Sequence, residues 1–396
     1  MKIAYVTSTL PFGPPEAFLI PEVKELRRRG HDLLIVPMWP RGPTVHRDAT
    51  EFSESVIRQP LLSPGIGIQS MLEALSRPVE VARVVATLRR SRSAPVLAKN
   101  MAVVPKALWL ARLARAAQAE HIHVHWAASS ATMGYIASAL TGIPWSMTAH
   151  RWDIAENNLI REKVTSAKFI RAIDKPGAEE LKALVDDPGK VHVIHMGVPL
   201  PSRNGSSAES SPRMRVVVAA NLVEKKGHRY LMEAALVLKS SGVALTIECF
   251  GDGPLRARLE SQCRSAGLSD TMRFLGVLGH EELLRRMSDR CWDAAVLPSI
   301  VTDDADKEGI PVFLIESMAA ALPVVSTDTG GIPELLGNGA GILVPPKDAH
   351  ALAQAILELA RKPSLREHIG NAGAQRVREQ FDVVATTSAL LEAITA

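Results

Sequence analysis

The sequence begins in the same way twice. Near its start, the apolar run KIAYVT (Lys2–Thr7) precedes a Pro/Gly-rich loop, a helix that ends in RRRG, and the strand-like segment DLLIV. In the second half, RVVVAA (Arg215–Ala220) precedes the loop NLVEKKG, a helical stretch at Tyr230–Lys239 and an apolar run at Val243–Phe250. A strand–loop–helix–strand order at both places predicts two doubly wound α/β domains in tandem.

The length of the chain supports this division. Its 396 residues suit two domains of about 150–200 residues each, and a hydrophobic content of 46% allows each of them a core. We expect a Rossmann-like domain over residues 1–198, a linker rich in Ser, Pro and Gly over 199–213, and a second Rossmann-like domain over 214–378. A final helix over 379–396 can pack back on the first domain. Open parallel sheets bind ligands at the carboxyl ends of their strands, so we expect a binding cleft between the two domains.

Charge and cysteine content narrow the class of protein. The net charge of +4 favours phosphate-bearing partners but does not by itself indicate nucleic acid. Three cysteines without a CxxC spacing indicate neither a disulfide framework nor a zinc site, which is typical of the reducing cytoplasm. No apolar run approaches the ~18 residues of a spanning helix. We therefore expect a soluble cytoplasmic protein, at most peripheral at the inner face of a membrane.

One segment, residues 77–118, is locally basic. Its only acid is Glu80, and its basic residues are Arg77, Arg83, Arg89, Arg90, Arg92, Lys99, Lys106, Arg112 and Arg115. The simpler interpretation is a set of solvated helix faces. The alternative is contact with an anionic membrane or with a lipid-diphosphate acceptor.

The stretch EGIPVFLIE (Glu308–Glu316) places two carboxylates around an apolar turn. Pro311 suits the first turn of a helix that we expect to continue until Pro323. The amides of Val312–Leu314 would then lie at the positive end of the helix dipole, where a phosphate can bind. The flanking carboxylates can accept hydrogen bonds from the hydroxyls of sugars. This pattern predicts a nucleotide-sugar site, while the alternative is a capping acid and a surface glutamate.

Several motifs, in order, resemble one family. The two glutamates are accompanied by seven further motifs. In chain order these are PPEAFLIPEVKELRRRGHDL, the stretch from His121 to Ile154 (which contains TAH), KVHVIHMGV, LVEKKG, FGDGPL, RFLG and STDTGGIPELL. Together they resemble family-four retaining glycosyltransferases of the GT-B fold, of the exopolysaccharide or colanic-acid type. The resemblance covers nearly the full length of the chain. It implies that a hexose is transferred from a UDP- or GDP-linked sugar to a saccharide or lipid-linked acceptor.

The resemblance also implies roles for single residues. Glu308 would contact the hydroxyls of the transferred sugar, Glu316 the ribose, Lys226 the diphosphate, and His150 the sugar from the first domain. Without the resemblance, His150 is more simply a hydrogen-bonded core histidine. The donor side would comprise Asn221, Gly251, Gly253, Phe274, Val277, Gly309, Ile310, Pro311, Val312, Phe313, Leu314 and Glu316, and the acceptor side Gly13, Glu16 and His125.

Two departures from the family pattern concern catalysis. Asn221 stands where the family usually has an arginine, so one cation on the leaving diphosphate is missing. In the loop near the N-terminus, Pro14 and Pro15 cannot donate amides. The missing arginine keeps open the alternative of a sugar-nucleotide-binding protein with impaired catalysis. A separate alternative is a sugar-nucleotide epimerase of the same fold.

Three further patterns are weaker. Asp304 and Asp306 spell an Asp-x-Asp, but the adjacent helix already offers a diphosphate site, so we expect no metal. The GDG of FGDGPL is followed by an arginine where a dinucleotide fingerprint needs its third glycine, so we expect no nicotinamide cofactor. Alternating histidines at 121, 123 and 125 have no carboxylate or cysteine at ligand spacing beside them, which favours a plain strand.

Overall fold

The structure is a computed structural model that describes residues 1–12, 16–44, 47–61, 63–201 and 213–396. It consists of two compact units. Unit 1 comprises Met1–Gly197 and Val383–Ala396, and unit 2 comprises Val198–Asp382. The last segment of the chain therefore belongs to the first unit. Most of the predicted linker, including residues 202–212, lies outside the described residues.

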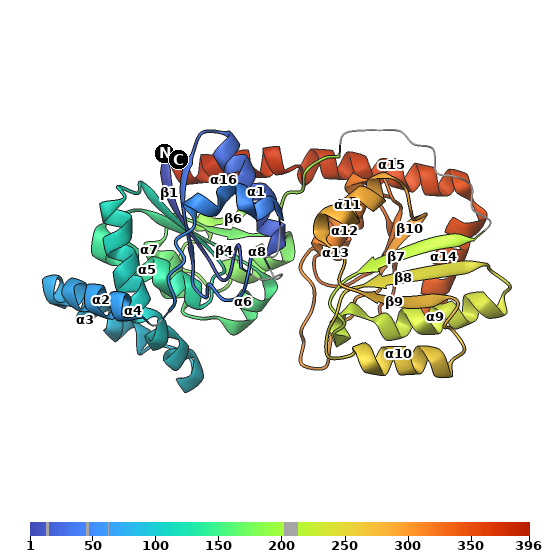
Figure 1. Cartoon of the computed structure of the whole chain (residues 1–396), viewed down its shortest axis with the longest axis horizontal. Coiled ribbons are helices and arrows are strands. Elements are labelled where there is room, and N and C mark those ends of the chain that lie inside the picture. Colours follow the sequence, from blue (N-terminus) through green and yellow to red (C-terminus); the bar gives the residue numbers. More distant parts are fainter. Residues whose placement is uncertain (13–15, 45–46, 62, 202–212) are drawn as a thin grey trace. The chain divides into compact units, whose positions relative to one another are not determined.

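Unit 1 is built on a six-stranded parallel sheet with the order β2-β1-β3-β4-β5-β6 (Figure 1). Its strands are β1 (Lys2–Thr7), β2 (Asp32–Pro37), β3 (His121–His125), β4 (Trp145–Ala149), β5 (Ile170–Ala172) and β6 (Val191–Val193). The strand order reverses between β1 and β3, so the loops that leave these two neighbours diverge at the carboxyl edge. Such a switch point is where open α/β sheets bind ligands.

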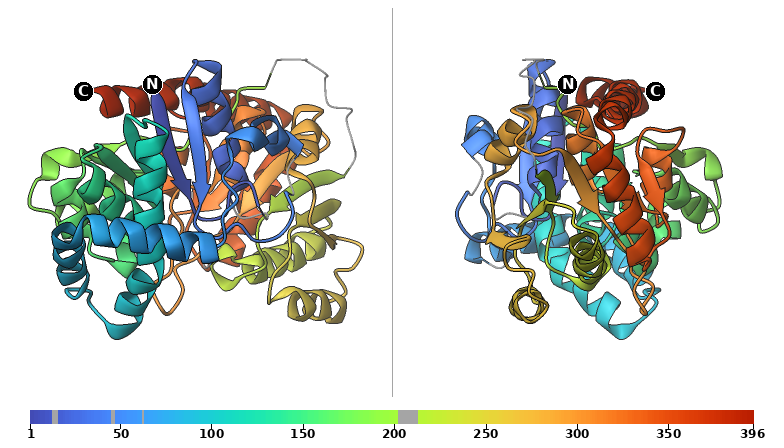
Figure 2. Two further views of the ribbon diagram at one scale, coloured as in Figure 1. Left: turned by 60° about the vertical axis from the view of Figure 1, so that its left-hand side comes forward. Right: turned by 90° about the vertical axis from the view of Figure 1, so that its right-hand side faces the viewer.

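Helices cover both faces of this sheet because alternate side chains of its strands point to opposite sides. Ala4 and Val6 of β1 pack in one core with α4 and α5, whereas Ile3 and Tyr5 pack in another core with α1 and α16. α1 and α16 contact each other and lie near the two labelled ends of the chain (Figure 1 and Figure 2). The helices are α1 (Ile20–Arg28), α2 (Pro64–Ser76), α3 (Pro78–Leu88), α4 (Ala94–Ala116), α5 (Ser129–Thr141), α6 (Arg151–Glu156), α7 (Ile160–Ser166), α8 (Lys175–Lys182) and α16 (Val383–Thr395), with 3-10 turns η1 (Ala17–Leu19), η2 (Arg47–Ser55) and η3 (Pro188–Lys190).

Unit 2 contains a second six-stranded parallel sheet, with the order β12-β11-β10-β7-β8-β9. Here the order reverses between β7 and β10. Its strands are β7 (Met214–Ala219), β8 (Leu245–Phe250), β9 (Met272–Gly276), β10 (Ala294–Leu297), β11 (Val324–Thr327) and β12 (Ile342–Val344). Its helices are α9 (His228–Ser240), α10 (Arg256–Ser265), α11 (His280–Ser288), α12 (Val312–Ala319), α13 (Ile332–Leu336), α14 (Ala349–Arg361) and α15 (Pro363–Gln380), with the 3-10 turn η4 (Glu224–Lys226).

The strands that open each half agree with the sequence prediction to within two residues. The helix expected to continue until Pro323 is shorter than predicted. Pro311 is its N-cap, α12 ends at Ala319, and Ala321 has a φ of 56°. A left-handed residue of this kind terminates a helix, because a further helical turn would require a negative φ.

Candidate active site

The residues of the EKKG and EGIPVFLIE motifs meet at the switch point of unit 2. Lys226 ends the turn η4, which follows β7, and Glu308 lies in the loop after β10. The Lys226 Nζ lies 2.9 Å from Glu308 Oε1, and both side chains are largely buried. Two predicted site residues, 82 positions apart in the sequence, thus form a buried ion pair at the edge where such sheets bind ligands.

Glycines let the backbone segments of this site approach one another. A methyl group on Gly227, whose φ is +67°, would overlap the carbonyl oxygen of Pro298 at the end of β10. A methyl group on Gly330, whose φ is +57°, would overlap the carbonyl oxygen of Glu308. Gly331 donates its amide to Gly309 O at 3.2 Å. The GG of STDTGGIPELL therefore fixes the position of the Glu308 loop, a role that only glycine can fill without displacement of the backbone.

The start of α12 offers fewer amides than the sequence predicted. Leu314 N donates to Pro311 O at 3.0 Å, so the prediction of three available amides is wrong for Leu314. Among the described residues, the amides of Val312 and Phe313 have no hydrogen-bond partner, and they lie at the positive end of the helix. The side chains of Phe313 and Leu314 are buried in the core of unit 2, and Ile310 and Pro311 are buried before them.

Glu316 lies one turn further along α12 and is buried against a histidine that the sequence analysis missed. The Nε2 atom of His280, the first residue of α11, lies 2.6 Å from Glu316 Oε1. His280 directly follows RFLGVLG, so the sequence could have predicted that it begins a helix after a strand. The sequence could not have predicted its contact with Glu316. The pair brings a carboxylate of α12 and an imidazole at the start of α11 together, and both groups can form hydrogen bonds with hydroxyl groups.

The FGDG loop packs on the loop after β7. A methyl group on Gly251 would overlap Ala220 O, and one on Gly253 would lie 2.6 Å from Leu222 O. Leu222 N in turn donates to Asp252 O at 2.9 Å. Asn221 lies between these contacts with its side chain exposed to solvent. The two glycines thus hold the backbone on either side of Asn221.

The other donor-side residues are farther along the sheet edge. Phe274 in β9 is half-buried against the core, and Val277, three residues later, is 74% exposed. Near Glu308, the two aspartates of the Asp-x-Asp are used locally: Asp306 pairs with Lys225 at 3.1 Å, and Asp304 accepts from Thr302 Oγ1 at 2.5 Å. Neither belongs to a metal-like cluster among the described residues.

In unit 1, His150 and His125 come together at the ends of β4 and β3. Their Nε2 atoms are 2.7 Å apart, so one ring donates and the other accepts. Trp126 stacks on His150 with ring centroids 4.3 Å apart. Burial lowers the pKa of His150 to about 3 and that of His125 well below its usual value, so both rings are neutral near pH 7. A neutral imidazole can bond a sugar hydroxyl without adding charge.

Glu16 has a structural task that the sequence did not reveal. Its carboxylate is buried and accepts from the amides of Ser8, Thr9 and Leu10 at 3.0, 2.5 and 2.6 Å. It also accepts from the indole N–H of Trp126. Glu16 therefore clamps the loop after β1 to the loop after β3, and its oxygens are already engaged. Gly13 lies outside the described residues.

No carboxylate stands at ligand spacing beside the alternating histidines in the sequence, but the fold brings one close to them. Glu22, from α1, lies with His123 and His125 in a buried group whose potential ligand atoms are within 4.8 Å of one another. Sequence spacing could not show this, because Glu22 comes from another element. Glu22 accepts from Tyr5 Oη and Arg171 Nη1, both at 2.6 Å, and His123 bonds Ser146 and Thr148. The group is a hydrogen-bonded core network.

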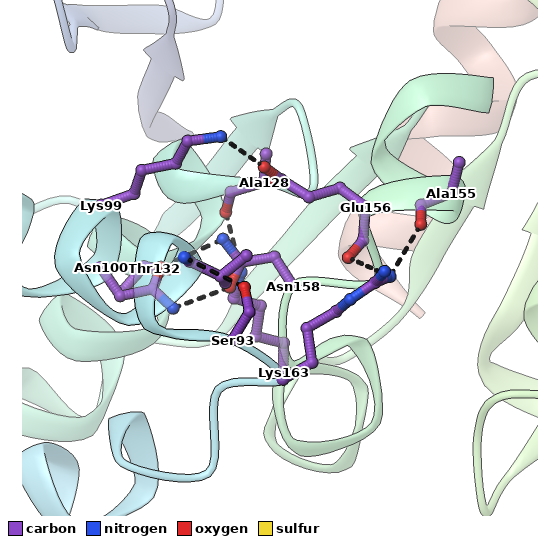
Figure 3. Close-up of polar contacts among 11 residues, drawn as sticks. Ser93, Lys99, Asn100, Ala128, Thr132, Ala155, Glu156, Asn158 and Lys163 are labelled. Atoms are coloured by element: carbon purple, nitrogen blue, oxygen red, sulfur yellow. Dashed lines mark hydrogen bonds and ion pairs between the residues drawn. The ribbon is translucent and has the colours of Figure 1, made fainter. Parts of the chain in front are cut away.

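Several basic side chains of the segment 77–118 form ion pairs or hydrogen bonds inside unit 1. Arg115 pairs with buried Glu73 at 2.8 Å, and Lys99 with Glu156 at 2.8 Å (Figure 3). Lys106 is fully buried and donates to three backbone carbonyls, at 2.6–2.9 Å. Arg77, Arg83, Arg89 and Arg90 are exposed. No helix in the described part of the chain is long and apolar enough to cross a membrane.

In comparison with known proteins, two family models match the chain, one in each half. Residues 22–201 match the family model "Glycosyltransferase Family 4", and residues 204–376 match "Glycosyl transferases group 1". The chain is 39% identical to the putative colanic acid biosynthesis glycosyltransferase WcaL of Salmonella typhimurium over 46% of this chain. It is 31% identical to the amylovoran biosynthesis glycosyltransferase AmsK of Erwinia amylovora over 59% of this chain. The aligned part spans about half the length of these relatives, 45% and 59% respectively.

The same fold is found in solved structures. Anabaena HepE in complex with UDP-glucose superposes with a TM-score of 0.75 over 100% of this chain and 99% of that chain, at 17% identity. A glycosyltransferase from Rickettsia africae superposes with a TM-score of 0.71 over 99% of this chain and 97% of that chain, at 18% identity. The two parallel six-stranded sheets with their helices are those of the GT-B fold.

Proposed function

The chain belongs to the glycosyltransferases that join a family 4 domain to a group 1 domain, and on this premise we propose that it transfers a hexose from a nucleoside-diphosphate sugar. The observation that supports this function most is the meeting of Lys226, Glu308 and the α12 N-terminus at one switch point. The named roles of WcaL and AmsK suggest an acceptor in exopolysaccharide biosynthesis. UDP-glucose, bound by Anabaena HepE, is the first donor to test.

The roles of the residues follow from their chemistry. The amides of Val312 and Phe313 would hold the distal phosphate, and Lys226 would stabilise the negative charge that builds up on the departing diphosphate. Glu308 would accept hydrogen bonds from hydroxyls of the transferred sugar, and donor binding would exchange the Lys226–Glu308 pair for these contacts. Glu316, with His280, would hold the ribose hydroxyls.

The transfer itself needs no protein nucleophile. The acceptor oxygen forms a bond to the anomeric carbon while the bond from that carbon to the phosphate oxygen breaks. The nucleoside diphosphate leaves with the electron pair, and a donor phosphate oxygen takes the acceptor proton. We propose that attack occurs from the leaving-group face, which retains the anomeric configuration, and that no metal ion is required, since Lys226 and the helix amides carry the neutralising charge.

Substitution of Glu308 tests the site. We expect Glu308→Gln to lower kcat with a nucleotide sugar about 100-fold, because the neutral amide accepts the sugar hydroxyls more weakly in the transition state. Lys226→Met should lose a comparable factor. The exposed acid Glu281, on α11, provides the control Glu281→Gln, which should transfer at the wild-type rate. A mass-spectrometric screen of UDP- and GDP-sugars, run with circular dichroism to check folding, measures these effects.

Each outcome of that screen has a meaning. Wild-type rates in both Glu308→Gln and Lys226→Met would contradict the proposed site. Tight donor binding without turnover would favour a binding protein in which Asn221 has removed the second cation. Conversion of the donor sugar without an acceptor would indicate an epimerase.

We further propose that unit 1 rests on an anionic membrane through the turn between α2 and α3. Large apolar side chains are exposed on this hairpin, and exposed arginines accompany them along α3. The apolar residues are Ile68, Met71, Leu72, Leu75 and Val79, and the basic ones Arg77, Arg83, Arg89 and Arg90. An apolar face flanked by cations inserts at the headgroup boundary of anionic bilayers.

A sedimentation assay tests the membrane contact. We expect the chain to co-sediment with vesicles that contain phosphatidylglycerol at low salt, and Leu75→Asp to reduce the bound fraction severalfold. Leu75 is 72% exposed, so the substitution should not unfold the helix. Leu236→Asp, on an exposed position of α9 in unit 2, is the matched control and should bind like the wild type. Equal binding by Leu75→Asp and the wild type would contradict the contact.

A further inference from the structure

A small pocket lies wholly within unit 2, between the N-terminal parts of α9 and α10, which are side by side (Figure 1). Its volume is about 140 Å³, far more than the roughly 10–15 Å³ that one water molecule needs. Among the described residues that line it there is none of the proposed donor site, such as Lys226, Glu308 or Glu316. We propose that this pocket binds the phosphate group of a small phosphorylated polyol, at a site separate from the donor site. The inference does not depend on the proposed glycosyl transfer.

His228, the first residue of α9, supplies a buried polar group to the pocket. It is 2% exposed, and neither its Nδ1 nor its Nε2 has a hydrogen-bond partner among the described residues. By contrast, His121, His123 and His125 each form a hydrogen bond through at least one ring nitrogen. Burial lowers the pKa of His228 to about 4, so its ring is neutral near pH 7 and offers one donor and one acceptor. Unpartnered buried polar atoms are costly, so a ligand that bonds this ring is favoured.

The first turn of α9 adds backbone donors beside this imidazole. Tyr230 N and Leu231 N both donate to Gly227 O, at 2.9 and 3.4 Å. The amides of His228 and Arg229, which precede them, have no hydrogen-bond partner in the part of the chain that the structure describes. Because α9 is 13 residues long, these amides lie at the positive end of a full helix dipole. Two unpaired amides and an imidazole N–H together form a set of donors that suits a phosphate.

Charged and polar side chains lie at the mouth of the pocket. Arg229 is exposed and pairs with Glu233 of the next turn at 2.9 Å. Arg258, on α10, is also exposed and has no ion-pair partner among the residues that the structure describes, so its guanidinium is available to a phosphate. Glu224 and Gln262 are exposed residues of the same lining. Their oxygens can accept hydrogen bonds from hydroxyl groups of the ligand.

Backbone hydrogen bonds hold the walls of the pocket in place. Ile300 N, in the loop after β10, donates to Lys225 O at 2.8 Å, and Leu255 N, before α10, donates to Leu222 O at 3.1 Å. Both Ile300 and Leu255 line the pocket. These bonds join three segments that are distant in the sequence, so the pocket is preorganised for a ligand. The ligand would contact the turn η4, which also carries Lys226.

The arrangement of these groups selects the class of ligand. The inner donors come from a helix N-terminus and an imidazole, and the Arg258 guanidinium lies at the mouth, which suits the several oxygens of a phosphate. Glu224 would repel a second phosphate at the mouth but can accept hydroxyl donors. Outside the pocket, a more open groove of about 400 Å³ continues between α9 and α10, past Met232 and Leu236. This groove gives room for the carbon skeleton of a phosphorylated polyol.

The test is titration calorimetry on the full chain with glycerol 3-phosphate, inorganic phosphate and glycerol as probes. We expect the wild type to bind glycerol 3-phosphate more tightly than inorganic phosphate and to show no binding of glycerol at the same concentration. Arg258→Gln and His228→Leu should each raise the Kd for glycerol 3-phosphate about tenfold or more. Arg264→Gln, at an exposed position of α10 outside the pocket, is the matched control and should bind like the wild type.

Thermal denaturation separates a ligand site from a structural role of His228. We expect His228→Leu to keep or raise the melting temperature without ligand, because it removes two unpartnered ring nitrogens, and to lose the rise that glycerol 3-phosphate gives the wild type.

Three outcomes would overturn the inference. The first is failure of the wild type to bind either phosphate, and the second is an unchanged Kd in both Arg258→Gln and His228→Leu. The third is loss of phosphate binding in Lys226→Met with no change in Arg258→Gln, which would place the phosphate at the donor site instead. Equal affinity for inorganic phosphate and glycerol 3-phosphate would contradict a polyol as the ligand.

Discussion

Gly330 shows how strongly single residues constrain the candidate donor site. Its backbone touches that of Glu308, and its φ is positive. We expect Gly330→Ala to lower the transfer rate at least tenfold and to destabilise unit 2, because the added methyl group must push the Glu308 loop away. Gly339 is a matched control, since its φ is also positive but a methyl group there meets nothing within 4 Å.

Comparing Gly330→Ala with Gly339→Ala separates the effect of the backbone contact from the effect of the left-handed backbone conformation. Gly339→Ala carries only the cost of a left-handed alanine, about 1–2 kcal/mol in the free energy of unfolding, and should transfer at the wild-type rate. Gly330→Ala carries that cost together with the overlap. Urea denaturation and steady-state kinetics on both variants measure the difference. Equal losses in the two variants would show that the close approach does not position Glu308.

At the scale of elements, the buried pair Glu22–Arg171 fastens α1 to the sheet of unit 1. Arg171 Nη1 lies 2.6 Å from Glu22 Oε2, and the side chains are 0% and 2% exposed. Arg171 also donates to the carbonyl oxygens of Ile194 and His195 at 2.8 and 2.6 Å. We expect Arg171→Met to lower the free energy of unfolding by about 3–5 kcal/mol, because it leaves the Glu22 carboxylate buried without its cation.

An exposed pair offers the contrast. Arg161 and Asp186 are 2.5 Å apart, with side chains 66% and 58% exposed. Arg161→Met should leave the free energy of unfolding nearly unchanged, since water solvates the remaining carboxylate. Chemical denaturation of both variants checks the contrast. A small loss in Arg171→Met would mean that Glu22 becomes protonated or solvated at little cost.

For the molecule as a whole, buried histidines determine how folding stability changes as the pH falls. Burial lowers the pKa of His121 to about 3, of His123 to about 4 and of His150 to about 3, and lowers that of His125 as well. In the unfolded chain each would titrate near 6.5. Between pH 6.5 and about 4 the unfolded state therefore binds more protons, and stability falls as pH falls.

The size of this response differs between the units. Each proton taken up on unfolding contributes about 1.4 kcal/mol per pH unit. In unit 1, Asp153 opposes the four histidines, because its pKa is raised to about 7 by burial. In unit 2, burial lowers the pKa of His228 to about 4. We expect calorimetry at pH 7.5, 6.5 and 5.5 to show the unit 1 transition falling faster than that of unit 2. Parallel shifts of both would contradict this account.

The sequence predicted the architecture well because local patterns determine it. Apolar runs, RRRG and Pro311 each mark an element without reference to distant residues. It predicted less of the site, because pairs such as His280–Glu316, Glu22–His123 and Glu16–Trp126 depend on which elements meet. The pocket of His228 was also missed, since only the fold shows that α9 and α10 leave a cavity beside a buried imidazole.

The assignment of α16 to unit 1 has a consequence for the synthesis of the chain. Unit 1 is completed only by Val383–Ala396, whose Leu390 and Ile394 lie in the core with β1 and α1. Unit 2 is one uninterrupted segment, closed by the bond from Val198 N to Phe381 O at 2.9 Å. On the ribosome, which makes the N-terminus first, the second unit thus has all of its residues before the first. The unit whose synthesis begins first is therefore the last that can finish folding.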